Sequence, residues 1–356
     1  MHNGYSHHLL PTSSFIHIHS VGFLCSFRSE YAWGMRNHHR VIQLMNEALK
    51  QRRCAFSTIR SENAALRRRA LGDDADLLRP ARGLYIPVSY WNGLTPEERT
   101  MHIARAFAAW HPTWIFGGNV AAAVHGLDGS WKMHDGTVTI VSSFQQSFSP
   151  MAKVRRTYIP EGMMKTQVVD GVTVLDKIST VLNCASQYEF PVALAVADSA
   201  LRQGLACANV LEACRRWDTM YENVVPVVCH ASAASENGGE SYCRAVMIEE
   251  GFVVPELQAG FVDELTGARY RVDYLWRLSD GQIVVGEFDG TEKYVNPIMT
   301  EHRSIREVVQ QERMREAALQ RCGVTRIVRF SYDEVVERDA LVKKLKEAGI
   351  PRYFAR

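Results

Sequence analysis

Three carboxylates within residues 270–294 have types and a spacing that could do chemistry. The segment YRVDYLWRLSDGQIVVGEFDGTEKY reads as two short strands joined by a turn, with Asp273 on the first strand and Glu287 and Asp289 on the second. Because side chains alternate faces along a strand, Glu287 and Asp289 project from the same face. If the two strands pair, Asp273 comes close to both. Such oxygen ligands suit a hard divalent cation, Mg²⁺ or Mn²⁺, which prepares water to attack a phosphodiester.

A plainer interpretation fits the same residues. Asp289-Gly290 is a common turn pair, and acidic side chains at strand ends usually face solvent or cap a helix. The spacing alone therefore leaves both a metal site and a simple turn open.

The elements around these acids indicate a small mixed sheet between helices. Three strands are expected near 252–265, 268–277 and 282–289, followed by a final strand, VTRIVRF. Helices are expected at 240–250, about 302–322 and 332–348. This order predicts an α/β sandwich, within a chain that is α+β as a whole.

The bulk composition narrows the class of protein. A chain of 356 residues predicts two or three domains, and its net charge of +2 means that any nucleic-acid surface must come from local clustering. The eight cysteines form no CxxC pair, which favours reduced thiols in a cytoplasmic protein over a zinc site. No run of about 18 apolar residues is present, so no membrane partner is expected.

The N-terminal part carries the pattern of a winged helix-turn-helix. Residues 1–38 are expected to be a disordered extension, with Met35 as an alternative start. Two helical stretches follow, HRVIQLMNEALKQRR and STIRSENAALRRRAL, the second capped by Ser57, and then a hairpin-like segment with Gly83 at its turn.

Basic side chains crowd this N-terminal unit. Arginine forks suit phosphates and guanine edges, so six arginines are candidates for DNA contact, although a charge run is also typical of a solvated helical face. These are Arg60, Arg67, Arg68, Arg69, Arg79 and Arg82.

The middle of the chain shows no catalytic pattern. A helix is expected from Thr95-Pro96 to about Trp110, then a small-residue helix, strands over 135–175 and further helices. His125 and Asp198 are expected to make structural hydrogen bonds. Residues 223–237 are poor in charge and rich in small side chains, which favours a linker.

Four segments in the C-terminal third occur in the order of a known nuclease group. They are GGESYCRAVMIEEGFVVPELQ, YRVDYLW, VVGEFDG and QERMREAALQRCGVTRIVRF. Over about residues 238–335 the chain resembles the very-short-patch-repair-like endonucleases of the PD-(D/E)xK fold.

The resemblance implies roles for five side chains. Asp273 and Glu287 would be metal ligands, Asp289 a second ligand or a water-orienting group, and Glu240 would complete the acidic cluster. Lys293 stands where many relatives carry histidine and would stabilise charge on a phosphate. Asp289 also stands where the fold usually has lysine.

The N-terminal two thirds resemble the AbiEi-type antitoxins of bacterial abortive-infection systems. The similarity lies in RPARGLYIP, FGGNVAAAVHGL and VTVLDKISTVLNCAS followed by ADSALRQG. It implies DNA binding by the winged helix, with the operator of its own operon or a cognate toxin as partners.

Two functions remain open at this point. The first is a metal-dependent DNA endonuclease, and the second is an antitoxin-like transcriptional regulator whose nuclease-fold domain is inactive. Four acids at one focus repel each other unless a cation or a basic partner neutralises them. The chain is expected to divide into five parts. These are an extension (1–38), a DNA-binding unit (39–92), a central α+β region (93–222), a linker (223–237) and a nuclease-like unit (238–356).

Overall fold

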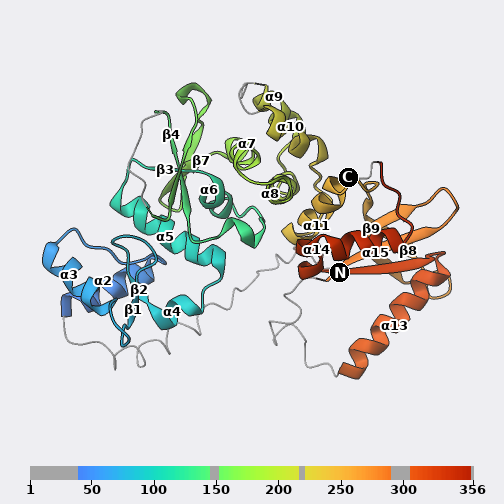
Figure 1. The fold of residues 1–356 in the computed structure, drawn as a ribbon, viewed down its shortest axis with the longest axis horizontal. Helices are drawn as coiled ribbons and strands as arrows, with labels where there is room; N and C mark the ends of the chain where they lie inside the picture. The colour runs from blue at the N-terminus through green and yellow to red at the C-terminus, as the bar shows by residue number, and fades with distance from the viewer. Residues whose placement is uncertain (1–38, 145–151, 216–220, 290–304, 354–356) are drawn as a thin grey trace, which may run out of the picture.

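The computed structural model describes residues 39–144, 152–215, 221–289 and 305–353. Over these ranges the protein is a mixed α/β molecule, as the sequence predicts, and three sheets are present in them. The blue N-terminal unit and the orange and red C-terminal sheet lie at opposite ends, with the central region between them (Figure 1). The N-terminal extension and Lys293 fall outside the described residues.

The N-terminal unit has the expected order of two helices and a hairpin. It consists of α2 (His39–Lys50), α3 (Arg60–Arg69), the antiparallel pair β1 (Leu77–Leu78) and β2 (Ile86–Pro87), and the short helix α4 (Val88–Asn92). Its small core packs α2 against α3 and the hairpin through Met45, Leu66 and Tyr85.

In this unit the structure corrects one sequence prediction, the cap at Ser57, and explains one residue, Gly83. Ser57 does not cap α3: the N-cap residue is Ile59, and the Ser57 hydroxyl accepts from the Ile59 N–H and donates to Glu62. Gly83 lies at φ +79°, and a Cβ on it would come within 2.7 Å of the Trp110 ring. Glycine is therefore required at this turn both for its conformation and for its space.

The central region is a five-stranded mixed sheet with helices packed on it. Its strands follow the order β5-β4-β3-β7-β6. They are β3 (Ile115–Phe116), β4 (Val138–Ser142), β5 (Val154–Tyr158), β6 (Thr166–Val169) and β7 (Val172–Leu175). Helix α5 (Pro96–Trp110) begins with a capping box of Thr95 and Glu98, and α6 (Gly118–Val124) follows β3. The His125 Nε2–H donates to the Leu175 carbonyl over 2.7 Å, the structural role expected of it.

A layer of helices continues toward the C-terminal sheet. It contains α7 (Lys177–Gln187), α8 (Phe190–Arg202), α9 (Cys207–Cys214) and α10 (Tyr221–His230). Helix α10 occupies half of the segment that the sequence favoured as a linker. Its Val224, Val227 and Val228 are buried in the main core, so the low charge of this segment reflects packing rather than a flexible connection.

The C-terminal unit is built on a four-stranded mixed sheet of order β11-β10-β9-β8. Strands β8 (Glu256–Val262), β9 (Arg269–Arg277) and β10 (Ile283–Asp289) form an antiparallel meander, and β11 (Arg326–Ser331) runs parallel to β10. Helix α11 (Gly238–Glu249) precedes the sheet, and α13 (Ile305–Arg321) crosses over between β10 and β11.

The helices cover both faces of this sheet. Tyr274 and Val284 pack into the main core with Val246 of α11, whereas Leu275 and Val285 pack with Leu319 of α13. The single C-terminal helix expected over 332–348 is divided into α14 (Tyr332–Glu337) and α15 (Asp339–Glu347), because Arg338 between them adopts φ +59°.

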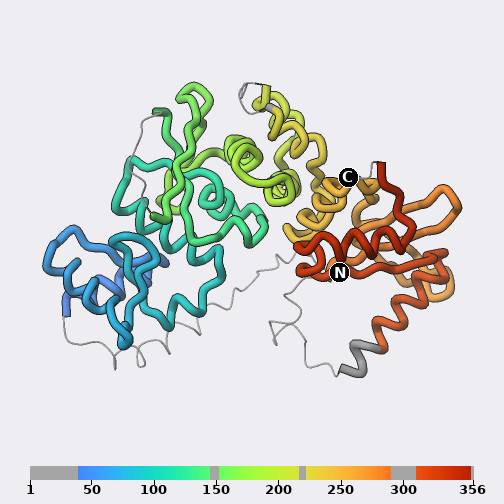
Figure 2. The backbone as a smooth tube through the Cα atoms, viewed as in Figure 1, coloured from blue at the N-terminus to red at the C-terminus, as the bar shows by residue number. Residues whose placement is uncertain are grey.

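Helices α8 and α11 join the central region to the C-terminal sheet. They pass beside one another in the middle of the molecule (Figure 2), and one continuous hydrophobic core runs through both. Arg244 of α11 and Asp198 of α8 form an ion pair of 2.6 Å there, with side chains 3% and 0% exposed. Asp198 thus has the structural role expected of it, and the contact it makes stabilises the packing of α8 against α11.

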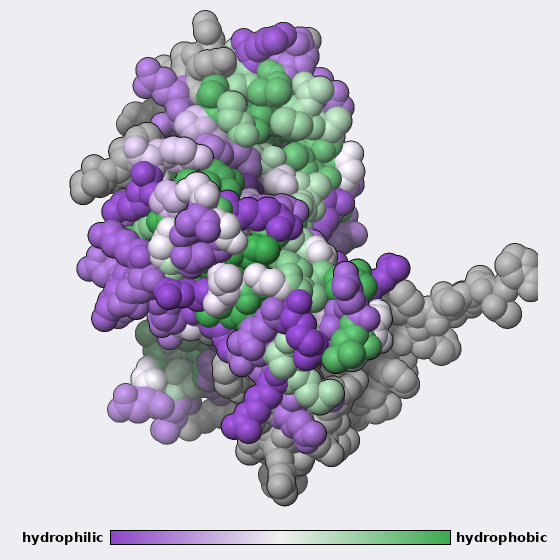
Figure 3. Space-filling model, turned by 90° about the vertical axis from the view of Figure 1, so that its right-hand side faces the viewer, coloured by the Kyte–Doolittle hydropathy of each residue, from purple (hydrophilic) through white to green (hydrophobic). Residues whose placement is uncertain are grey.

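Seen from the C-terminal end, the surface is largely hydrophilic, with an apolar area in the upper part of the view (Figure 3). Within the described ranges, no helix combines the length and the apolar composition that a membrane crossing needs.

Candidate acidic site on the C-terminal sheet

Asp273 lies on the middle strand β9, where the pairing on both sides is interrupted. The ladder with β10 ends at the Gly286–Tyr274 pair, one step before Glu287 and Asp273 would oppose each other. Beyond that point the Phe288 N–H donates to Asp273 Oδ2 over 2.8 Å. On the other side, the regular register omits Gln258, the residue opposite Asp273, and Gln258 has φ +51°. A non-glycine residue in this region costs free energy and is found more often at functional sites.

Glu240 reaches the same place from the first turn of α11. The Glu240 residue is 5% exposed, and its carboxylate accepts hydrogen bonds from the Glu236 N–H (2.8 Å) and from Asn237 Nδ2 (2.7 Å). The Gln258 amide nitrogen lies 2.9 Å from Glu240 Oε2 and 3.4 Å from Asp273 Oδ1. One amide group therefore lies between two carboxylates that come from different elements.

This environment raises the pKa of the Glu240 carboxyl. Burial, and then the neighbouring charge of Asp273, raise the pKa of the Glu240 carboxyl to about 7, although hydrogen bonds from Gln258 and Asn237 oppose the shift. Such perturbed carboxyls are typical of functional sites, because a shifted pKa places protonation close to neutral pH.

We expect the metal-free protein to lose stability between about pH 5 and pH 7 as Glu240 ionises. Folded Glu240 keeps a proton that the unfolded chain has already released, so the stabilisation is complete below the unfolded pKa and is lost as pH rises through about 7. The expected loss is on the order of 2–3 kcal/mol. Denaturant unfolding of wild type and Glu240→Gln at pH 5 and pH 8 measures it. Equal pH dependence in both proteins would show that Glu240 does not titrate in this way.

Glu287 has a different kind of partner. Arg315 of α13 donates to Glu287 Oε1 through Nε (3.1 Å) and Nη2 (2.6 Å), and Glu287 is 14% exposed. Arg329, its neighbour in register on β11, places Nε 3.7 Å from Oε2. Arg329 also pairs with Glu312 and Glu316 of α13. The positive charge that neutralises Glu287 thus comes from Arg315 of the crossover helix α13 and from Arg329 of the last strand, β11.

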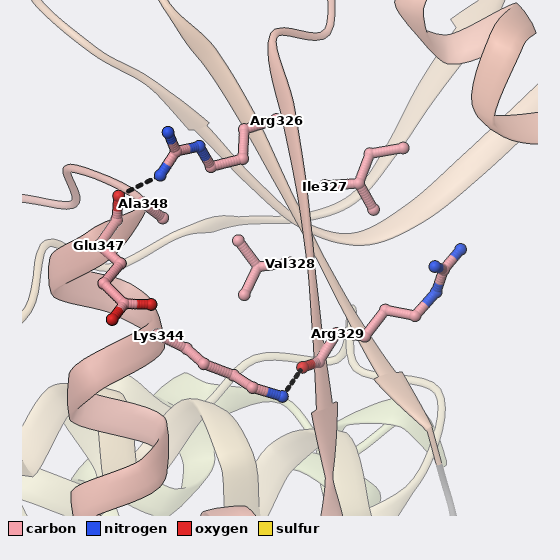
Figure 4. A pocket seen from close by; sticks show the side chains of 7 residues that line it. All are labelled: Arg326, Ile327, Val328, Arg329, Lys344, Glu347 and Ala348. Atoms are coloured by element: carbon pink, nitrogen blue, oxygen red, sulfur yellow. Dashed lines mark hydrogen bonds between the residues drawn. The ribbon is translucent and has the colours of Figure 1, made fainter.

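Figure 4 shows how β11 orients Arg329. Val328 points from the strand toward α15 across a shallow hollow, and Lys344 reaches from α15 to the strand, where it donates to the Arg329 carbonyl over 2.8 Å. The Arg329 side chain extends to the opposite side of the strand, away from α15. This direction carries its guanidinium to the face on which Glu287 meets α13.

The structure thus brings together some of the expected residues. Glu240 and Asp273 meet around Gln258, and Glu287 lies on the adjacent strand but is paired with arginines. Asp289 ends β10 opposite Ser331, and Lys293 is outside the described residues. Among the residues that the structure describes, no group of three or more His, Cys, Asp or Glu side chains is arranged to hold a metal ion.

Three contributors to the site did not stand out from the sequence. Gln258 and Arg329 occur in segments that carry the nuclease resemblance, ELQ and VTRIVRF, but no spacing rule connects them to Asp273 or Glu287. Arg315 lies 28 residues from Glu287 along the chain. Only the strand register could have suggested the first two, because Arg329 pairs with Glu287 in the β10–β11 ladder and Gln258 stands opposite Asp273 within the β8–β9 ladder.

The donor chemistry of the site fits a hard divalent cation. Carboxylate oxygens are the ligands that Mg²⁺ prefers, and Asp273 and Glu287 lie on adjacent strands at the same level of the sheet. Glu287 would have to exchange its arginine partners for the cation. Asp273 and Glu287 therefore fit a divalent cation in their ligand type and in their position on the sheet. Binding of the cation would displace Arg315 from Glu287.

The six candidate DNA-contacting arginines divide into two kinds. Arg60, Arg67 and Arg68 on α3 and Arg79 and Arg82 before Gly83 are exposed. Arg69 is not: its side chain is 13% exposed and both Nε and Nη2 donate to the Asp76 carboxylate. Arg69 therefore fastens α3 to the segment entering the hairpin instead of facing a partner.

Comparison of the sequence with known proteins assigns no family to the chain. No family model matches the chain, and none of the curated proteins matches it.

Proposed function

We propose that this protein is a DNA-associated, metal-dependent endonuclease that hydrolyses phosphodiester bonds. The observation that carries the proposal is the meeting of Glu240 and Asp273 around Gln258, next to Glu287, on a mixed sheet. The element order of helix, three-stranded meander, crossover helix and parallel strand supports the resemblance to the PD-(D/E)xK nucleases. Fold resemblance alone would not define function, so the proposal depends on the acids.

The residues take the following roles in the proposal. Asp273 and Glu287 bind Mg²⁺ or Mn²⁺, and Asp289 binds with them or orients the attacking water. A bound divalent cation supplies acidification of that water and stabilisation of charge on the phosphate. Glu240, which lies beside Asp273 around Gln258, completes the acidic cluster. Lys293 stabilises negative charge on the phosphate.

DNA binding is assigned to the N-terminal unit as a winged helix. Helix α3 would enter the major groove and the hairpin would contact the backbone, the arrangement that the exposed arginines support. The central region would be the AbiEi-like part. The described cysteines are free, which supports a cytoplasmic location for this nuclease.

Replacing Arg60, Arg67 and Arg68 together with alanine should weaken DNA binding about tenfold or more at low salt. Each lost phosphate contact should also lower the salt slope by about one unit, because fewer counterions are released. Fluorescence anisotropy on a duplex across a salt series measures both. Arg215→Ala removes an arginine that is 76% exposed at the C-terminal end of α9 and should change neither. Arg69→Ala should lower thermal stability, because it breaks the contact with Asp76. An unchanged affinity and slope in the triple variant would remove the winged-helix assignment.

A specific observation favours a second function. Glu287 already has two guanidinium partners, as it would in a fold that keeps its acids only for stability. The protein would then be an AbiEi-like antitoxin or transcriptional regulator with an inactive nuclease-fold domain, bound to an operator or a cognate toxin. Incubation with supercoiled plasmid and Mn²⁺ separates the two functions. Nicking supports the endonuclease, whereas bound but intact plasmid supports the regulator.

A further inference from the structure

Arg315 is held at Glu287 by contacts from two strands of the sheet. Besides its two hydrogen bonds to Glu287 Oε1, its Nη2 donates to the Arg271 carbonyl over 2.7 Å. Its guanidinium carbon also lies 6.0 Å from the centre of the Tyr270 ring. The side chain is 30% exposed, so it keeps an open side toward solvent.

The hydrogen-bond donors to Glu287 are charged groups. Glu240 and Asp273 accept hydrogen bonds from neutral amide donors, whereas Glu287 accepts from guanidinium groups. A half-buried carboxylate needs compensation for its lost hydration, and a fixed positive charge provides it. The same positive charge competes with any cation for the oxygens of Glu287.

We propose, on the basis of the function assigned above, that Arg315 is an exchangeable counter-ion. It neutralises Glu287 in the metal-free protein, yields the carboxylate to a divalent cation, and becomes available to a DNA phosphate. The exposed side of Arg315 and its long, rotatable side chain allow this movement without displacement of α13. Its guanidinium suits a phosphate as well as a carboxylate, because both accept paired N–H donors.

Arg329 is not equivalent to Arg315 in this exchange. Its Nε is 3.7 Å from Glu287, and its other nitrogens pair with Glu312 and Glu316 of α13. These carboxylates hold Arg329 in place when the cation binds. Arg329 is therefore a fixed positive charge, and Arg315 is the one that moves.

Calorimetric titration with Mn²⁺ of wild type, Arg315→Met and Arg315→Lys tests this role. Arg315→Met should bind Mn²⁺ about three- to tenfold more tightly than wild type, because an ion pair no longer has to be broken. Arg315→Lys should lie between the two. DNA cleavage by Arg315→Met should nevertheless be slower at saturating Mn²⁺, since the phosphate contact is lost. Arg277→Met removes an exposed ion pair between Arg277 of β9 and Glu256 of β8, and this variant should match wild type in both respects.

The outcomes distinguish a failure of this role from a failure of the function. If wild type and Arg315→Met bind Mn²⁺ equally, or the variant binds it less tightly, Arg315 is a structural partner only and the exchange is wrong. If no variant and no wild-type protein binds Mn²⁺, the nuclease function itself fails. Arg315→Lys, which keeps the charge, serves as the test if Arg315→Met does not fold, as judged by circular dichroism.

Discussion

Asp273→Asn should lower Mg²⁺- or Mn²⁺-dependent DNA cleavage by about 10²- to 10⁴-fold and leave DNA affinity within about twofold. The substitution keeps the size of the side chain and its ability to accept from the Phe288 N–H, but removes the negative charge that binds a cation. DNA affinity changes little, because most of the proposed DNA contacts come from arginines of the N-terminal unit at the opposite end of the molecule, and Arg315 adds one phosphate contact at the site. Single-turnover cleavage of a labelled duplex, with anisotropy on the same duplex, gives both numbers.

Glu287→Gln should have an effect of the same size. Asp280→Asn is a matched control, because Asp280 is an exposed carboxylate in the turn between β9 and β10 that bonds only locally to Gln282. It should cleave at the wild-type rate. Cleavage that survives both Asp273→Asn and Glu287→Gln would place the active site elsewhere, whatever its metal dependence.

The second large effect concerns stability. Asp198→Ala should lower the free energy of unfolding by about 3–5 kcal/mol, because it leaves the Arg244 guanidinium buried without its counter-ion. The loss is increased by two further acceptor contacts of Asp198, to the Ser232 N–H at 2.7 Å and the Ser235 hydroxyl at 3.4 Å. Denaturant unfolding followed by tryptophan fluorescence measures the change.

Two comparisons isolate the contribution of burial. Glu256→Ala breaks an ion pair of 4.0 Å whose partners are about 60% exposed and should cost no more than about 0.5 kcal/mol. Asp198→Leu combined with Arg244→Met should recover part of the loss, because it removes both charges together. A cost for Asp198→Ala as small as that of Glu256→Ala would mean that α8 and α11 are not fastened by this pair.

The order of elements in the C-terminal unit could be predicted because it depends on local pattern. Runs rich in β-branched and aromatic residues on either side of the Ser279-Asp280-Gly281 turn predict β9 and β10. The spacing of Glu240 and Arg244 and the charged stretch at about 302–322 predict α11 and α13. The failures came where local pattern is ambiguous. A run of small residues with little charge, such as 223–237, occurs both in linkers and in tightly packed helices. The packing of α10 against α7, α8 and α9 buries Val224 and Val227, and the sequence alone does not show this packing.

The acids of the site could be named from the sequence, but their partners could not. Asp273, Glu287 and Glu240 belong to segments with recognisable types and order. The position of Arg315 depends on where the crossover helix places its third turn against β10, a tertiary property with no periodic signal. The positive φ of Gln258 is likewise a consequence of the interrupted pairing at Asp273. The charge balance of the site was therefore not predictable, although its need for a basic partner was.

Calorimetric titration of Mn²⁺ into wild type and Asp273→Asn, both metal-free, is the most direct test of the proposed nuclease site. We expect a saturable Mn²⁺ isotherm for wild type that is lost or weakened at least about tenfold in Asp273→Asn, with circular dichroism unchanged. Identical isotherms, or no binding by the wild-type protein, would contradict the metal site. The C-terminal sheet would then be an inactive nuclease fold in a DNA-binding regulator.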